Sequence, residues 1–105
     1  MSDSQQPVDI EREKVHLETS QIAWKQLQRF FASGQAIAVS ETLDLVEVAY
    51  QVSRDNKTLV AQWMSENKLG QVSDRQAQNW FESDALLWTV VIKPWVLVQY
   101  RQERL

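Results

Sequence analysis

The sequence contains no cysteine, a single histidine, two glycines and two prolines among its 105 residues. The absence of cysteine excludes disulfides, thiolate-bound zinc, iron–sulfur clusters and cysteine nucleophiles. With glycine only at Gly34 and Gly70, the chain has no glycine-rich phosphate-binding loop of the Walker or Rossmann type. A closed metal site needs about three or four donors, which one histidine does not supply. We therefore predict no cofactor and no metal site.

The sequence also lacks a long apolar run and a strong excess of charge. Its longest apolar stretch, residues 85–100, is interrupted by Lys93 and Pro94 and falls short of the ~20 residues of a membrane helix. The start, MSDSQQPVDIE, has no basic segment followed by an apolar one, so no secretory signal is predicted. The net charge of −3 gives no long-range attraction to nucleic acids. These absences predict a cytoplasmic protein and disfavour nucleic acid and membranes as partners.

What the sequence does contain is enough apolar material for one small domain. Hydrophobic residues make up 44% of the chain. The polar residues 1–7 end at a proline, which predicts a disordered tail, and residues 8–105 are expected to form a single α+β domain. Helical periodicity predicts about five helices, over residues 8–19, 21–33, 43–54, 57–68 and 74–83.

Several residues have the character of helix ends. Ser20 is expected to cap the second helix and Gly70 to end the fourth, while Ser73 and Gln76 have the spacing of a capping box for the fifth. The inner face of the fourth helix is expected to include Met64 next to a tryptophan. These signals place three helices between residues 43 and 83.

Apolar and β-branched segments predict the strands. They are residues 36–39, 87–92 and 95–100, with a turn or bend at Lys93 and Pro94. The expected fold is α+β, with the helices packed on a small two- or three-stranded antiparallel sheet. The order of elements also allows a winged-helix-like arrangement, in which the helix that contains Trp63 would be the recognition helix. That helix carries no arginine, so a winged helix of this sequence is expected to bind protein.

Five tryptophans are the one anomaly of composition. Three lie on the apolar faces of predicted helices and are expected in the core: Trp24, Trp63 and Trp80. The other two flank the turn between the last strands, where an aromatic ring that projects into solvent would anchor a partner. The predicted partner-binding residues are Trp88, Lys93, Pro94 and Trp95.

Asp44 and Glu47 form an acidic helix face. Residues at i and i+3 share a face, so these carboxylates could act as a paired acid and base or as half of a metal site. His16, on a charged helix, is the one candidate for an imidazole base. The simpler interpretation of both features is a solvated helix surface.

The segments WKQLQRFFASGQ, LDLVEVA, LGQVSDRQAQNW and KPWVLVQ resemble a family of short bacterial proteins known only as a domain of unknown function. The likeness extends from about Leu17 to Gln99. One departure is Ala23, where similar sequences are expected to have proline. The resemblance implies a bacterial protein and transfers no catalytic role.

The leading hypothesis is a noncatalytic protein-interaction module of the bacterial cytoplasm. Its partner would be an unidentified protein or a second copy of the chain, since an apolar strand such as WVLV could pair across a dimer axis. The alternative is a small enzyme or ligand-binding protein that uses the acidic face. A third hypothesis is a nucleic-acid-binding winged-helix-like domain.

Overall fold

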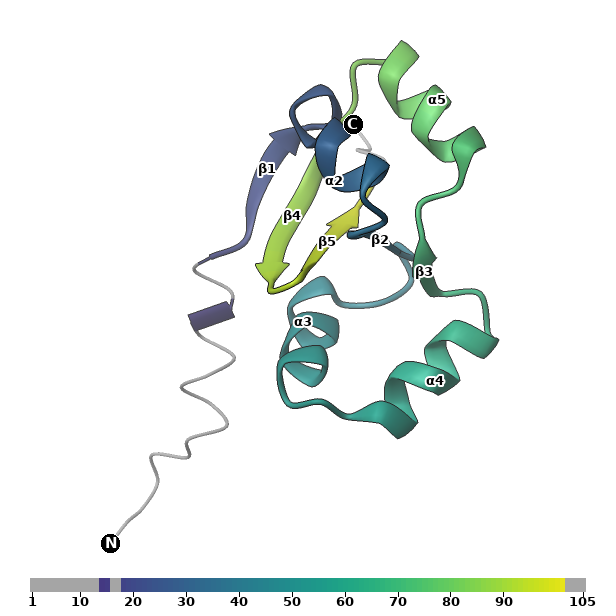
Figure 1. Ribbon diagram of the computed structural model, residues 1–105. Coiled ribbons are helices and arrows are strands. Elements are labelled where there is room, and N and C mark those ends of the chain that lie inside the picture. The colour runs from purple at the N-terminus through teal and green to yellow at the C-terminus, as the bar shows by residue number, and fades with distance from the viewer. Residues whose placement is uncertain (1–13, 16–17, 102–105) are drawn as a thin grey trace, which may run out of the picture.

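A five-stranded mixed sheet organises the part of the chain that the computed structural model describes, residues 14–15 and 18–101 (Figure 1). The strands are β1 (Ser20–Ala23), β2 (Ala36–Val39), β3 (Leu69–Gln71), β4 (Leu86–Ile92) and β5 (Trp95–Gln99). Their order in the sheet is β1-β4-β5-β2-β3. The pair of β2 and β5 is parallel, and the other three pairs are antiparallel.

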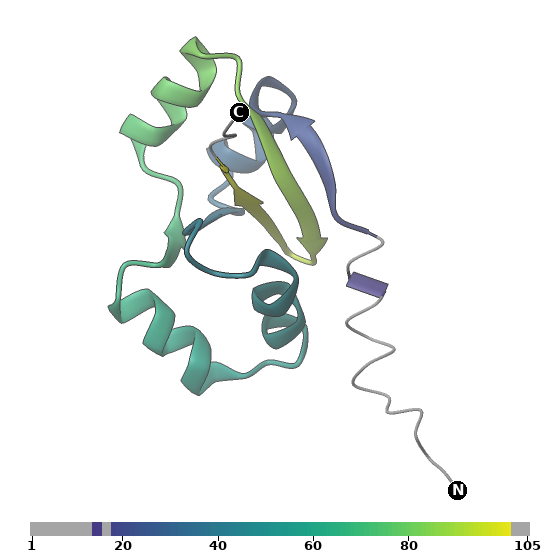
Figure 2. The same ribbon diagram turned by 180° about the vertical axis from the view of Figure 1, so that it is seen from behind.

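Helices pack on both faces of this sheet. They are the 3₁₀ helix η1 (Trp24–Leu27) and the α-helices α2 (Gln28–Ala32), α3 (Leu45–Ser53), α4 (Lys57–Ser65) and α5 (Asp74–Glu82). Figures 1 and 2 show α4 and α5 extending to opposite sides of β3. None of the helices in the described residues is long and apolar enough to cross a membrane.

The predicted α+β class is confirmed, but the predicted sheet is wrong in two respects. It has five strands instead of two or three, and the β2–β5 pair makes it mixed. The β4–β5 hairpin occupies the centre of the sheet, so the winged-helix-like alternative is also wrong, because a wing is a peripheral hairpin. The predicted helix over residues 8–19 and the tail over 1–7 fall largely or wholly outside the described residues.

The first described strand replaces the start of a predicted helix. Ser20 was expected to cap that helix, but it begins β1 and pairs with Thr89 of β4. The strand ends where the Trp24 backbone N–H donates to the Ala85 carbonyl over 2.9 Å, and η1 begins there. Pairing with β4 therefore overrides the local helical pattern of this segment.

The sequence signals for helix ends succeed at the start of α5 and fail at the end of α4. Gly70 does not end α4, because it lies within β3 and pairs with Ala38. The helix ends earlier, at Ser65, with Glu66 as its C-cap, and Asn67 follows with a φ of 60° in the left-handed region. The capping box of Ser73 and Gln76 is confirmed at the start of α5.

Two apolar clusters fill the space on either side of the sheet. The cluster under η1, α2 and α5 contains Trp24, Leu27, Ala36, Val72, Ala77, Trp80, Ala85, Leu87, Val96 and Val98. The cluster under α3 and α4 contains Val15, Val39, Leu45, Val48, Ala49, Trp63, Leu69, Val90 and Leu97. Trp24 and Trp80 meet edge to face with ring centroids 5.2 Å apart. The prediction that Trp24, Trp63 and Trp80 lie in the core is confirmed.

Candidate functional site

An apolar groove lies between the sheet and the helical pair α3–α4. Its volume is about 870 Å³, and the strands β2, β3, β4 and β5 all contribute to it. The residues that line it are Ile37, Val52, Ser53, Asp55, Asn56, Lys57, Val60, Ala61, Met64, Leu69, Gly70, Gln71, Ile92, Lys93, Trp95 and Leu97. Trp95 is 40% exposed and Met64 53% exposed, so two large apolar side chains of the groove remain in contact with water.

The position of Met64 corrects an expectation from the sequence. Met64 was expected on the inner face of its helix, but the buried residue of α4 is Trp63. The helix rests on the sheet through this tryptophan, and the next residue is rotated toward the groove. A flexible thioether at this place suits a surface that adapts to a partner.

The charges in the groove are few. The Nζ of Lys57 and the Oδ2 of Asp55 lie 4.0 Å apart and form an exposed ion pair. Lys93 has no ion pair with any described residue. The turn that carries Lys93 is held by Gln35, whose side-chain amide donates to the Pro94 carbonyl over 2.9 Å. The groove therefore combines an apolar lining with one lysine that makes no ion pair with a described residue.

The structure separates the four residues that the sequence placed at this turn. Lys93 and Trp95 line the groove, whereas Pro94 is exposed at the turn and follows a cis peptide bond. Trp88 is half-buried against the α3–α4 cluster, and the guanidinium carbon of Arg101 lies 5.3 Å from its ring centroid. Trp88 is thus outside the groove.

The two carboxylates of the acidic face are used locally. Asp44 lies before α3 and caps it, since its Oδ1 accepts from the backbone N–H groups of Val46 and Glu47. The Glu47 carboxylate accepts a 2.7 Å hydrogen bond from Gln51. Within residues 14–15 and 18–101, no group of three or more acidic or imidazole side chains could hold a metal ion. His16 lies outside the described residues.

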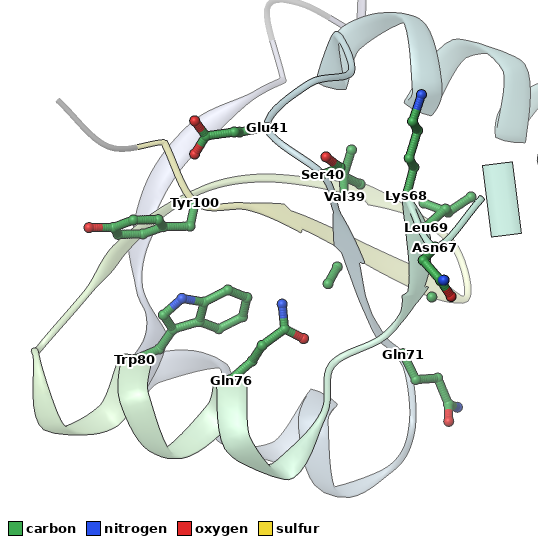
Figure 3. Close-up of a pocket in the computed structure, with 12 residues that line it drawn as sticks. Val39, Ser40, Glu41, Asn67, Lys68, Leu69, Gln71, Gln76, Trp80 and Tyr100 are labelled. Atoms are coloured by element: carbon green, nitrogen blue, oxygen red, sulfur yellow. The ribbon is translucent and has the colours of Figure 1, made fainter. Parts of the chain in front are cut away.

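A second, polar pocket lies where β2 and β5 end (Figure 3). Because these strands are parallel, their carboxyl ends meet at one edge of the sheet. The pocket measures about 480 Å³ and is lined by Ala38, Val39, Ser40, Glu41, Asn67, Lys68, Leu69, Gly70, Gln71, Gln76, Trp80 and Tyr100. Figure 3 shows Gln76 and Trp80 rising from α5 toward the strands, with the ring of Tyr100 next to Trp80 and Glu41 farther from α5.

The sequence did not predict most of the residues that line the apolar groove and the polar pocket. The only local signal for the polar pocket is the spacing of Gln76 and Trp80, which puts them on one face of α5. Glu41 and Tyr100 come from segments 59 residues apart, joined by the parallel pairing of β2 with β5. The groove likewise depends on the packing of α4 beside β3, for which the sequence carries no local signal.

The fold and these two hollows define a small α+β protein with a central mixed sheet. The chain matches the family model described as a protein of unknown function, DUF2288, over residues 10–100, and it belongs to this family. It is similar to the NMR solution structure of PA1075 from Pseudomonas aeruginosa, with a TM-score of 0.77 and 38% identity over 98% of this chain and 93% of that chain. No curated protein matched. The family resemblance read from the sequence motifs is thereby confirmed.

Proposed function

We propose that the chain is a noncatalytic protein-interaction module of the bacterial cytoplasm, whose partner inserts an apolar peptide segment into the groove beside Trp95. The observation that supports this best is the partly exposed Trp95 ring on the wall of an apolar groove of about 870 Å³. Exposed apolar grooves are typical of interaction sites, and tryptophan is enriched among the residues that dominate their binding energy.

The charges of the groove favour one kind of segment. Asp55 and Lys57 form an ion pair with each other, whereas Lys93 makes no ion pair with a described residue. An acidic side chain on the partner, next to its apolar anchors, would complement Lys93 and fix the direction of the segment. The proposed occupant is therefore a short amphipathic peptide that carries apolar residues and an aspartate or glutamate.

Selection from a library of displayed random peptides tests this proposal directly. The selected peptides should combine apolar residues with an acidic one, and their affinity should fall about tenfold or more in Trp95→Ala, because a central aromatic anchor is removed. Lys93→Glu should weaken the same peptides through like-charge repulsion. Leu86→Ala is the matched control, since Leu86 is 55% exposed but lies outside the groove. Fluorescence anisotropy of labelled peptides gives the affinities.

Two outcomes would contradict the peptide proposal. Peptides that bind Trp95→Ala as tightly as the wild type would show that another surface is used. A concentration-dependent dimer in analytical ultracentrifugation that Trp95→Ala converts to monomer would identify a second copy of the chain as the occupant. The far-UV circular dichroism of each variant must match the wild type, because a loss of folding would imitate a loss of binding.

A further inference from the structure

The polar pocket at the ends of β2 and β5 has flat aromatic walls. Tyr100 is 43% exposed and Trp80 9% exposed, and both line the pocket. Figure 3 shows both rings on the same side of the pocket. Exposed aromatic faces stabilise planar rings by stacking, and this contribution does not depend on a particular pattern of hydrogen bonds. The walls therefore favour a flat ligand.

Two hydrogen-bond donors on α5 face this space without a partner. The side-chain oxygen of Gln76 accepts from the Ser73 backbone N–H over 3.1 Å, which leaves the amide nitrogen of Gln76 to donate. No hydrogen bond joins the indole N–H of Trp80 to a described residue, and indole is a donor only. A ligand on this side must present acceptors.

The opposite side of the pocket carries a hydrogen-bond acceptor, the carboxylate of Glu41. Glu41 has no ion pair with a described residue, and an ionised carboxylate accepts hydrogen bonds without donating any. The ammonium of Lys68, the one cation of the lining, lies 3.5 Å from Glu66, which offsets its charge. The pocket thus provides an acceptor edge and a donor edge but no strong site for phosphate.

We propose that this pocket binds a planar nitrogen heterocycle with the edge pattern of guanine, as a free base or a nucleoside. The adjacent ring and exocyclic N–H groups of guanine donate to the Glu41 carboxylate. Its carbonyl oxygen and ring nitrogen accept from Gln76 and Trp80, and its ring stacks on Tyr100. Adenine presents a ring nitrogen acceptor where guanine presents a ring N–H, so the carboxylate disfavours adenine.

The test is a titration of the ¹⁵N-labelled chain with guanosine, followed by NMR. The indole N–H signal of Trp80 and the side-chain amide of Gln76 should shift and saturate, because both groups gain acceptors. Adenosine and uridine, titrated in parallel, should bind at least about tenfold more weakly, since guanine offers the Glu41 carboxylate two adjacent N–H donors whereas adenine and uracil offer one each.

Two variants of the pocket sharpen the test. Glu41→Gln removes the charged acceptor and should weaken guanosine about tenfold or more. Gln76→Glu removes the amide donor but keeps the oxygen that the capping box needs, so α5 should remain folded. Glu82→Gln is the matched control for Glu41→Gln: it removes one negative charge from an exposed position outside the pocket and should leave the affinity unchanged.

These outcomes test the guanine proposal independently of the peptide proposal for the groove. Equal affinity for guanosine and adenosine, or unchanged affinity in Glu41→Gln, overturns it. The absence of a saturable shift at Trp80 with all three nucleosides overturns it as well. None of these results bears on the peptide proposal, because Trp95 and Met64 do not line this pocket.

Discussion

The Gln99 side chain shows how a buried polar residue can determine local structure. It is 0% exposed, and its amide nitrogen donates to the carbonyls of Ser40 (2.8 Å) and Leu43 (2.7 Å). Its oxygen accepts from Arg101 over 2.7 Å. The side chain thus joins the end of β5 to the loop that leads from β2 into α3. Buried amides with all groups satisfied specify one arrangement of the chain around them.

Replacing Gln99 with methionine should therefore destabilise the protein although the volume changes little. Two backbone carbonyls lose their donor, and we expect a loss of about 2 kcal/mol in the free energy of unfolding. Urea denaturation followed by circular dichroism measures it. Gln21→Met, at an exposed position of β1, is the control and should change stability by no more than about 0.5 kcal/mol. Equal effects in the two variants would show that the hydrogen bonds of Gln99 contribute nothing.

At the scale of elements, all four α-helices of the described residues end in the same way. The residue after each C-cap has a positive φ: Gly34 (78°), Asp55 (58°), Asn67 (60°) and Asp84 (58°). In each case two backbone hydrogen bonds close the helix end, as in the bonds from Asn67 to Met64 and from Lys68 to Trp63. Only one of the four positions is a glycine, so three helix ends carry some conformational strain.

Relief of this strain is testable at Asp55. Asp55→Gly should raise the free energy of unfolding by about 0.5 to 1 kcal/mol, because glycine adopts a positive φ without a steric cost. Its ion pair with Lys57, at 4.0 Å and with both side chains exposed, offsets little of this gain. Ser53→Gly, in the last turn of the same helix, should instead lower stability by about 0.5 kcal/mol. Thermal denaturation of the two variants would contradict the argument if both lost stability equally.

The same helix ends explain how far the sequence predicts the elements. The capping box of Ser73 with Gln76 was located correctly, and so were the long strands at residues 86–99, whereas the cap predicted at Ser20 was not. The end of α4 was misplaced because Gly70 is the stronger signal for a helix end than Asn67. The strands β1 and β3 were missed, since segments as short as SQIA and LGQ carry no period and are defined by their partners β4 and β2.

The candidate sites show the same contrast between residues that have a local sequence signal and residues brought together by tertiary packing. Trp95 and Lys93 were singled out because a tryptophan beside a turn is an anomaly of local sequence, and both line the groove. Met64, Glu41 and Tyr100 were not, because their positions depend on which strands and helices pack together. Sequence-local chemistry was therefore predictable, and sites built across the sheet were not.

At the scale of the whole molecule, the two apolar clusters share one structural element. Val96 and Leu97 are neighbours on β5, yet Val96 belongs to the cluster under α5 and Leu97 to the cluster under α3 and α4. Both side chains are almost fully buried. Neither layer of helices can keep its contacts if β5 leaves the sheet, so the described part of the chain should unfold in a single transition.

Tryptophan signals on the two faces test this cooperativity. In the chain labelled with 5-fluorotryptophan, Trp24 and Trp80 report on one cluster and Trp63 on the other. The native ¹⁹F signals of all three should disappear at one urea concentration. Leu97→Ala should lower that midpoint equally for all three, with a loss of about 2 to 5 kcal/mol in stability. A midpoint that falls for Trp63 alone would mean that the helical layers unfold independently, and that the groove can open without disturbing the polar pocket.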